Sequence, residues 1–149
     1  MKTYSLKPKE INRKWYVLDA TEAPLGRVST QAASLLLGKG KPGVSDHIDN
    51  GDFVIIINAE KLVVTGNKRE DKTYYRHSGF PGGLSQRSLN EQIERDFTKV
   101  FRGSIRGMLP DNKLRDDRLK RLKIYGGPEH QHAAQTPKNV SLSRKGKVK

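Results

Sequence analysis

Apolar residues recur along the chain in patterns that predict alternating strands and helices. Residues 15–19 form a short β-prone segment, and residues 53–57 are apolar at every position. A strand without alternation is typical of a central strand covered on both faces. Between them, apolar residues after Pro24 recur at helical spacing and predict a helix that ends at Gly38. That stripe consists of Leu25, Val28, Ala32, Leu35 and Leu36.

The second half of the chain continues the alternation. Ser88 and Glu91 have the spacing of a capping box and predict the start of a second helix, which Pro110 ends. Its apolar stripe consists of Phe97, Val100, Phe101, Ile105 and Met108. Residues 113–122 predict a charged helix with Leu114, Leu119 and Leu122 on its inner side. Further short strands are expected at 62–64, 73–75 and 124–125. This order of elements favours an α/β fold with a mainly parallel sheet.

Composition adds a polyanionic partner to this picture. The 149 residues suit one domain, and the net charge is +13 with an apolar fraction of only 34%. Residues 101–149 hold 13 basic and 4 acidic side chains, so the excess lies late in the chain. An anionic membrane would require an amphipathic basic helix or a lipid signal, and we find neither. Without cysteine, a signal-peptide core or a long apolar run, we expect a soluble intracellular protein.

Two loop motifs raise the question of catalysis. Residues 38–43 fit G-x-G-x-x-G, but they follow a helix and contain Pro42, which argues against a dinucleotide site. We interpret them as a loop that presents Lys39 and Lys41 to phosphates. The acidic residues of 46–52, together with His47, could bind a metal or share a proton. Hydrogen bonds to their own loop are the favoured interpretation, because Asp commonly plays that part in turns.

Basic and aromatic residues supply the stronger signal. Tyr74 and Tyr75 follow a basic stretch, and strand alternation predicts that one ring packs inside while the other can stack on a base. The densest ordered basic cluster lies within 115–123, where Arg118 and Arg121 share a helix face. His130 and His132 could be zinc ligands, RNA contacts or plain surface residues, and the first alternative lacks evident further ligands.

Several ordered motifs resemble one family along nearly the whole chain. The matching segments are residues 15–20, 25–27, 47–52, 57–61, 64–68, 75–79, 81–83, 106–110, 119–125 and 129–135. In these the chain resembles the bacterial type of the large-subunit ribosomal protein uL13 family. Arg115-Asp116 departs from the usual Gly-Arg of that family, and residues 142–149 run past its usual end.

The resemblance implies a three-layer α/β/α domain with about four mostly parallel strands, spanning 15–135. An N-terminal arm, 1–14, and a basic tail, 136–149, flank it. It also implies binding to large-subunit rRNA, support of early subunit assembly, neighbouring ribosomal proteins as partners and a cytoplasmic ribosome, an organellar ribosome being the alternative. We expect no catalysis, cofactor, metal, small-molecule substrate, membrane or homo-oligomer. The residues predicted to bind rRNA are Arg27, Lys39, Lys41, His47, Lys68, Arg69, Lys72, Tyr75, Arg76, His77, Arg106, Lys113, Arg115, Arg118, Lys120, Arg121, Lys123, His130, His132, Arg144, Lys145 and Lys147.

Overall fold

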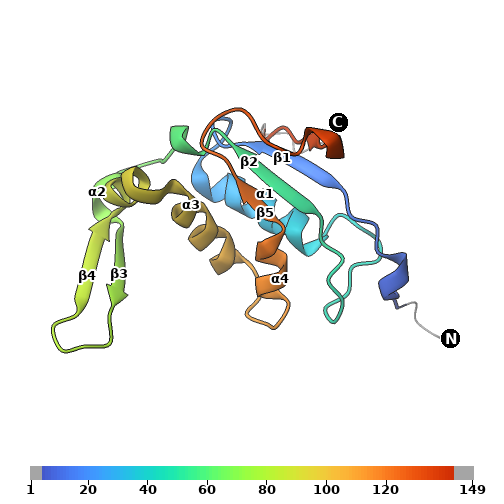
Figure 1. Cartoon of the computed structure of the whole chain (residues 1–149), viewed down its shortest axis with the longest axis horizontal. Coiled ribbons are helices and arrows are strands. Elements are labelled where there is room, and N and C mark those ends of the chain that lie inside the picture. The colour runs from blue at the N-terminus through green and yellow to red at the C-terminus, as the bar shows by residue number, and fades with distance from the viewer. Residues whose placement is uncertain (1–4, 143–149) are drawn as a thin grey trace.

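A four-stranded parallel sheet forms the centre of the protein (Figure 1). The computed structural model describes residues 5–142. The sheet has the order β5-β2-β1-β6, and each of its three strand pairs is parallel. Its strands are β1 (Trp15–Asp19), β2 (Phe53–Ile57), β5 (Leu122–Ile124) and β6 (Lys138–Asn139). The predicted strands at 15–19 and 53–57 are confirmed, and β2 is central, as its unbroken apolar run indicated.

Helices and a separate hairpin complete the described chain. The antiparallel hairpin pairs β3 with β4 and lies outside the main sheet. The remaining elements are η1 (Pro8–Glu10), α1 (Leu25–Leu37), η2 (Ala59–Lys61), α2 (Lys68–Asp71), β3 (Thr73–His77), β4 (Leu84–Ser88), α3 (Leu89–Met108), α4 (Arg115–Lys120) and η3 (Ala133–Gln135).

Both faces of the sheet are covered, which confirms the predicted fold class. On one face Leu18, Val54 and Ile56 join a single core with residues of α1 and α3. The opposite face carries Val17 and Ile55, which are also buried, because side chains alternate along a strand. On this face the Trp15 ring stacks on the ring of Phe53, with 4.2 Å between the ring centroids. The chain segment after β5 places the His132 ring against the same indole.

Helix α3 consists of two helical halves joined at Asp96. The capping box is confirmed: Ser88 Oγ accepts from Glu91 N at 3.3 Å, and Glu91 Oε2 accepts from Ser88 N at 3.1 Å. Asp96 has extended backbone angles inside the helix, and its carboxylate accepts from Thr98 N at 3.0 Å. It therefore caps the second half as an N-terminal residue does.

Several predicted boundaries differ from the structure. Residues 62–64 form no strand, since Val63 O accepts from Leu25 N and holds the start of α1 instead. Leu122 begins β5 rather than ending a helix, and Met108 is 41% exposed. Strands β4 and β6 went unpredicted because their polar sequences carry no apolar alternation. Val140 follows β6 and is buried in the core, so part of the expected tail belongs to the folded domain.

Candidate nucleic-acid interface

The β3–β4 hairpin extends away from the sheet (Figure 1). Its register gives it two chemically different faces. The register places Tyr74 opposite Arg87 and Arg76 opposite Ser85, so these four side chains share the inner face toward α3. The outer face carries Tyr75, Gln86, His77 and Leu84. Cationic groups thus lie on the inner face, while the outer face is aromatic, apolar and polar without a formal charge.

Exposed rings accompany the hairpin cations. Tyr75 is 65% exposed, and Phe80 in the connecting turn is 74% exposed. Tyr74 instead packs against the core, and burial raises the pKa of its phenol. The predicted division between the two tyrosines is therefore confirmed. No Asp or Glu occurs between Lys72 and Asn90, so the hairpin brings no negative charge of its own.

A second basic surface runs along the C-terminal half of α3. Lys99, Arg102 and Arg106 are exposed and lie three and four residues apart, which places them on one side of the helix. They line a hollow of about 390 Å³ beside Asp116 and Leu119 of α4. Of these three cations only Arg106 was predicted, although the spacing itself indicated a basic stripe beside the apolar one.

Arg121, predicted to bind RNA, is buried and makes an internal ion pair. Its guanidinium donates to both carboxylate oxygens of Asp49, with 2.7 Å between Nη2 and Oδ1. It also donates to the carbonyl oxygens of Leu36 at 3.3 Å and Asp52 at 3.4 Å. Arg118 is buried as well, and its Nε lies 3.5 Å from Asp49 Oδ1. Both side chains therefore hold the fold together instead of facing solvent.

Lys41 also has an internal partner. Its ammonium donates to Asp52 Oδ1 at 2.6 Å and to the carbonyl oxygens of Asn12 at 2.8 Å and Asn50 at 2.9 Å. The loop of residues 38–52 is thus anchored by cations, which supports the interpretation that its carboxylates are structural. Asp49 forms an ion pair with Arg121, and Asp52 forms one with Lys41. These two carboxylates therefore serve the fold, which argues against the alternative that the loop is a catalytic or metal site.

Neighbouring carboxylates pair with the half-buried Arg115 and the exposed Lys120 of α4. Arg115 pairs with Asp111 at 2.8 Å, and Lys120 pairs with Asp117 at 2.8 Å. The hydrogen bond between the last two raises the pKa of Lys120 and lowers the pKa of Asp117. The densest basic cluster in the sequence therefore offers much less free positive charge than its composition suggests.

The other predicted residues fall into three groups: half-buried, outside the described residues, and exposed. His132 is half-buried, with its ring against Trp15 and its Nε2 3.0 Å from the Tyr125 hydroxyl. His130 is half-buried too, and Lys123 lies half-buried in β5. Arg144, Lys145 and Lys147 lie outside the described residues. The exposed members are Arg27, Lys39, His47, Lys68, Arg69, Lys72, Arg76, His77 and Lys113.

Sequence reasoning also overlooked Arg87, Lys99, Arg102 and Phe80. Arg87 and Phe80 were missed because the hairpin was not predicted, although the Gly-rich turn between two short polar strands was a usable signal.

A basic α/β domain with an exposed aromatic hairpin is typical of RNA-binding proteins. No helix within residues 5–142 has both the length and the apolarity needed to cross a bilayer. A family model described as ribosomal protein L13 matches residues 13–131. The chain belongs to the ribosomal protein L13 family, a family of structural ribosomal proteins and not of enzymes.

Individual relatives match over almost their entire length. A protein named large ribosomal subunit protein uL13 from Mycobacteroides abscessus is 56% identical over 137 residues, which cover 92% of this chain and 93% of that protein. The protein of the same name from Paenarthrobacter aurescens is 51% identical over 144 residues, covering 97% and 98%. That of Listeria welshimeri is 54% identical over 140 residues, covering 94% and 97%. The resemblance seen in the sequence is thereby confirmed.

Proposed function

We propose that the chain is a structural constituent of the large ribosomal subunit in the cytoplasm, where it binds 23S-type rRNA and supports early subunit assembly. Its family and its net charge of +13 support this assignment. Neighbouring ribosomal proteins are the expected protein contacts. The residues of the chain perform no chemical step in this role, because their task is to bind and position a folded polyanion.

One observation carries the location of the interface: the cations are unequally neutralised. Carboxylates pair with Arg115 and Lys120, and the loop carboxylates Asp52 and Asp49 pair with Lys41 and Arg121. Arg76 and Arg87 on the hairpin, and Arg102 and Arg106 on α3, make no ion pair within residues 5–142. Unpaired exposed cations attract phosphate most strongly, because binding does not require an existing ion pair to break. Among the surfaces with unpaired cations, the hairpin also carries the exposed rings of Tyr75 and Phe80, so we place the main contact on the hairpin and the adjoining α3.

Affinity and specificity arise from different groups in this arrangement. Each Arg or Lys that neutralises a phosphate releases condensed counterions, so binding weakens steeply as salt rises. The exposed rings of Tyr75 and Phe80 can stack on unpaired bases, at about 1–3 kcal/mol per base. Duplex RNA hides its bases in a deep, narrow groove, so rings of this kind select loops and bulges. The hairpin thus favours folded rRNA over a regular duplex.

The proposal is tested by measuring the affinity of the full chain for large-subunit rRNA and for unrelated RNA of equal length. Both titrations are carried out at physiological ionic strength, because nucleic-acid affinities have meaning only at a stated salt concentration. We expect clear preference for the large-subunit rRNA and recovery of the protein with the large subunit after sedimentation of a lysate. Equal affinity for both RNAs would overturn the assignment.

A further inference from the structure

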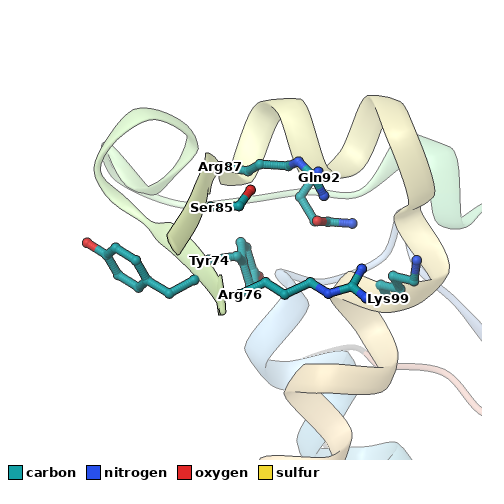
Figure 2. Close-up of a pocket in the computed structure, with 7 residues that line it drawn as sticks. Tyr74, Arg76, Ser85, Arg87, Gln92 and Lys99 are labelled. Atoms are coloured by element: carbon teal, nitrogen blue, oxygen red, sulfur yellow. The ribbon is translucent and has the colours of Figure 1, made fainter. Parts of the chain in front are cut away.

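A cavity of about 310 Å³ lies between the inner face of the hairpin and helix α3 (Figure 2). Arg76 and Arg87 extend into this region from β3 and β4, while Gln92 and Lys99 face it from α3. The hairpin contributes Tyr74 and Ser85 as well. Positive and hydrogen-bonding groups from two separate elements therefore converge on one hollow.

The local geometry of α3 brings the helix side of this cavity together. Gln92 precedes Asp96 and Lys99 follows it, so the two residues belong to different halves of the helix. Gln92 is only 8% exposed and donates to Asp96 O at 3.5 Å, which links its side chain to the bend. Residues seven positions apart lie on nearly the same side of a regular helix, and here both Gln92 and Lys99 line the cavity, one on each side of the bend at Asp96.

The cavity is cationic, and only one of its three cations has an ion-pair partner within residues 5–142. No carboxylate lines it, and Arg76 and Arg87 make no ion pair within residues 5–142. Lys99 is exposed and pairs with the half-buried Asp96, with 3.3 Å between Nζ and Oδ2. Three like charges around one hollow repel one another unless an anion enters, and a guanidinium can grip two phosphate oxygens at once. Charge and donor geometry both favour a phosphate group.

We propose that this cavity binds one phosphodiester group of rRNA, held by Arg76, Arg87 and Lys99. The inference rests on the proposed function and specifies one contact within it. The bound phosphate bridges the hairpin and α3, so it also sets the angle of the hairpin relative to the domain. An RNA backbone that enters a concave site between two elements must turn locally, which suits a loop or bulge.

The test compares two double variants of the full chain. Arg76→Gln with Arg87→Gln removes two charges from the cavity, while Lys9→Gln with Lys138→Gln removes two exposed charges elsewhere. We expect the cavity variant to bind large-subunit rRNA roughly 10- to 100-fold more weakly at physiological salt. Its slope of log affinity against log salt should fall by about 0.7–0.9, the value for one lost phosphate contact.

The control variant should retain the wild-type slope. Equal losses in both variants would show a general effect of net charge and would overturn the proposed site. An unchanged slope in the cavity variant would do the same. Circular dichroism establishes that each variant is folded, and Lys99→Gln provides an independent removal from α3 if the hairpin variant does not fold.

A footprint locates the contact on the RNA. Iodine cleavage of phosphorothioate-substituted large-subunit rRNA should reveal a phosphate that the wild-type chain protects and the cavity variant leaves open, with other protections unchanged. Uniform weakening of all protections would refute the site. If the wild-type chain shows no preference for large-subunit rRNA, the proposed function itself fails, and this outcome differs from failure of the cavity alone.

Discussion

Replacing Arg121 with Met should destabilise the protein without touching its exposed surface. The guanidinium and the carboxylate of Asp49 are 7% and 11% exposed, and they form a two-point ion pair. The Met side chain keeps much of the volume but leaves a buried carboxylate facing a neutral group. Removing one partner of a buried ion pair costs about 3–5 kcal/mol, because the remaining charge has lost its hydration without compensation.

The structure also predicts a graded series around Asp49. Arg118 stays near that carboxylate, yet its Nε is 3.5 Å from Oδ1 and makes no hydrogen bond to it. Arg118→Met should therefore cost less than Arg121→Met. Arg102 is exposed and makes no ion pair within the described part of the chain, so Arg102→Met should change stability by roughly 0.5 kcal/mol or less.

Urea denaturation followed by circular dichroism measures these free energies directly. For a domain of this size the Arg121 variant should also lower the melting temperature by roughly 6–20 °C. If the unfolding free energy of Arg121→Met lay within about 0.5 kcal/mol of the wild-type value, the reasoning would be refuted. The buried Arg121–Asp49 ion pair would then stabilise the protein no more than an exposed ion pair does. Arg102→Met, in contrast, should weaken rRNA binding while the free energy of unfolding stays close to the wild-type value.

Three single sites give four further predictions. Gly51→Ala should destabilise by at least about 1–3 kcal/mol in urea denaturation, because an added Cβ would lie 1.7 Å from Leu36 O, and a near-wild-type midpoint would contradict this. Asp96→Ala should cost about 0.5–2 kcal/mol through the lost cap in the middle of α3, and equal stability would exclude that role. The Thr98 hydroxyl lowers the pKa of Asp96, so its stabilisation is complete above the unfolded pKa near ~3.9 and is lost as pH falls through the lower folded pKa. Acid titration of the unfolding free energy should therefore be shallower in Asp96→Asn than in wild type, and identical profiles would refute the assignment. Tyr75→Ala should weaken binding to looped rRNA by roughly 1–3 kcal/mol and leave duplex binding unchanged, and equal losses on both RNAs would exclude stacking.

Local sequence patterns were sufficient for much of the fold. The strands at 15–19 and 53–57, the first helix and the capping box at Ser88 were all predicted, because hydrophobic periodicity and capping act over a few residues. The hairpin was only half predicted, since β4 is polar and is defined by its pairing with β3. Strand β6 consists of two polar residues, and it forms only because it pairs with β1, which lies far away in the sequence.

The sequence by itself determined that this chain is a basic α/β member of the ribosomal protein L13 family. Only the tertiary structure decided which of its cations are free. Arg121 and Asp49 are 72 positions apart, so no local pattern reveals their ion pair. A count of charges treats a buried, paired guanidinium and an exposed, unpaired guanidinium alike. Their free energies of binding to phosphate nevertheless differ, because the buried guanidinium must first break its internal ion pair. For that reason Arg118 and Arg121 of the densest cluster became part of the scaffold, whereas Arg76 and Arg102 stay exposed and make no ion pair within residues 5–142.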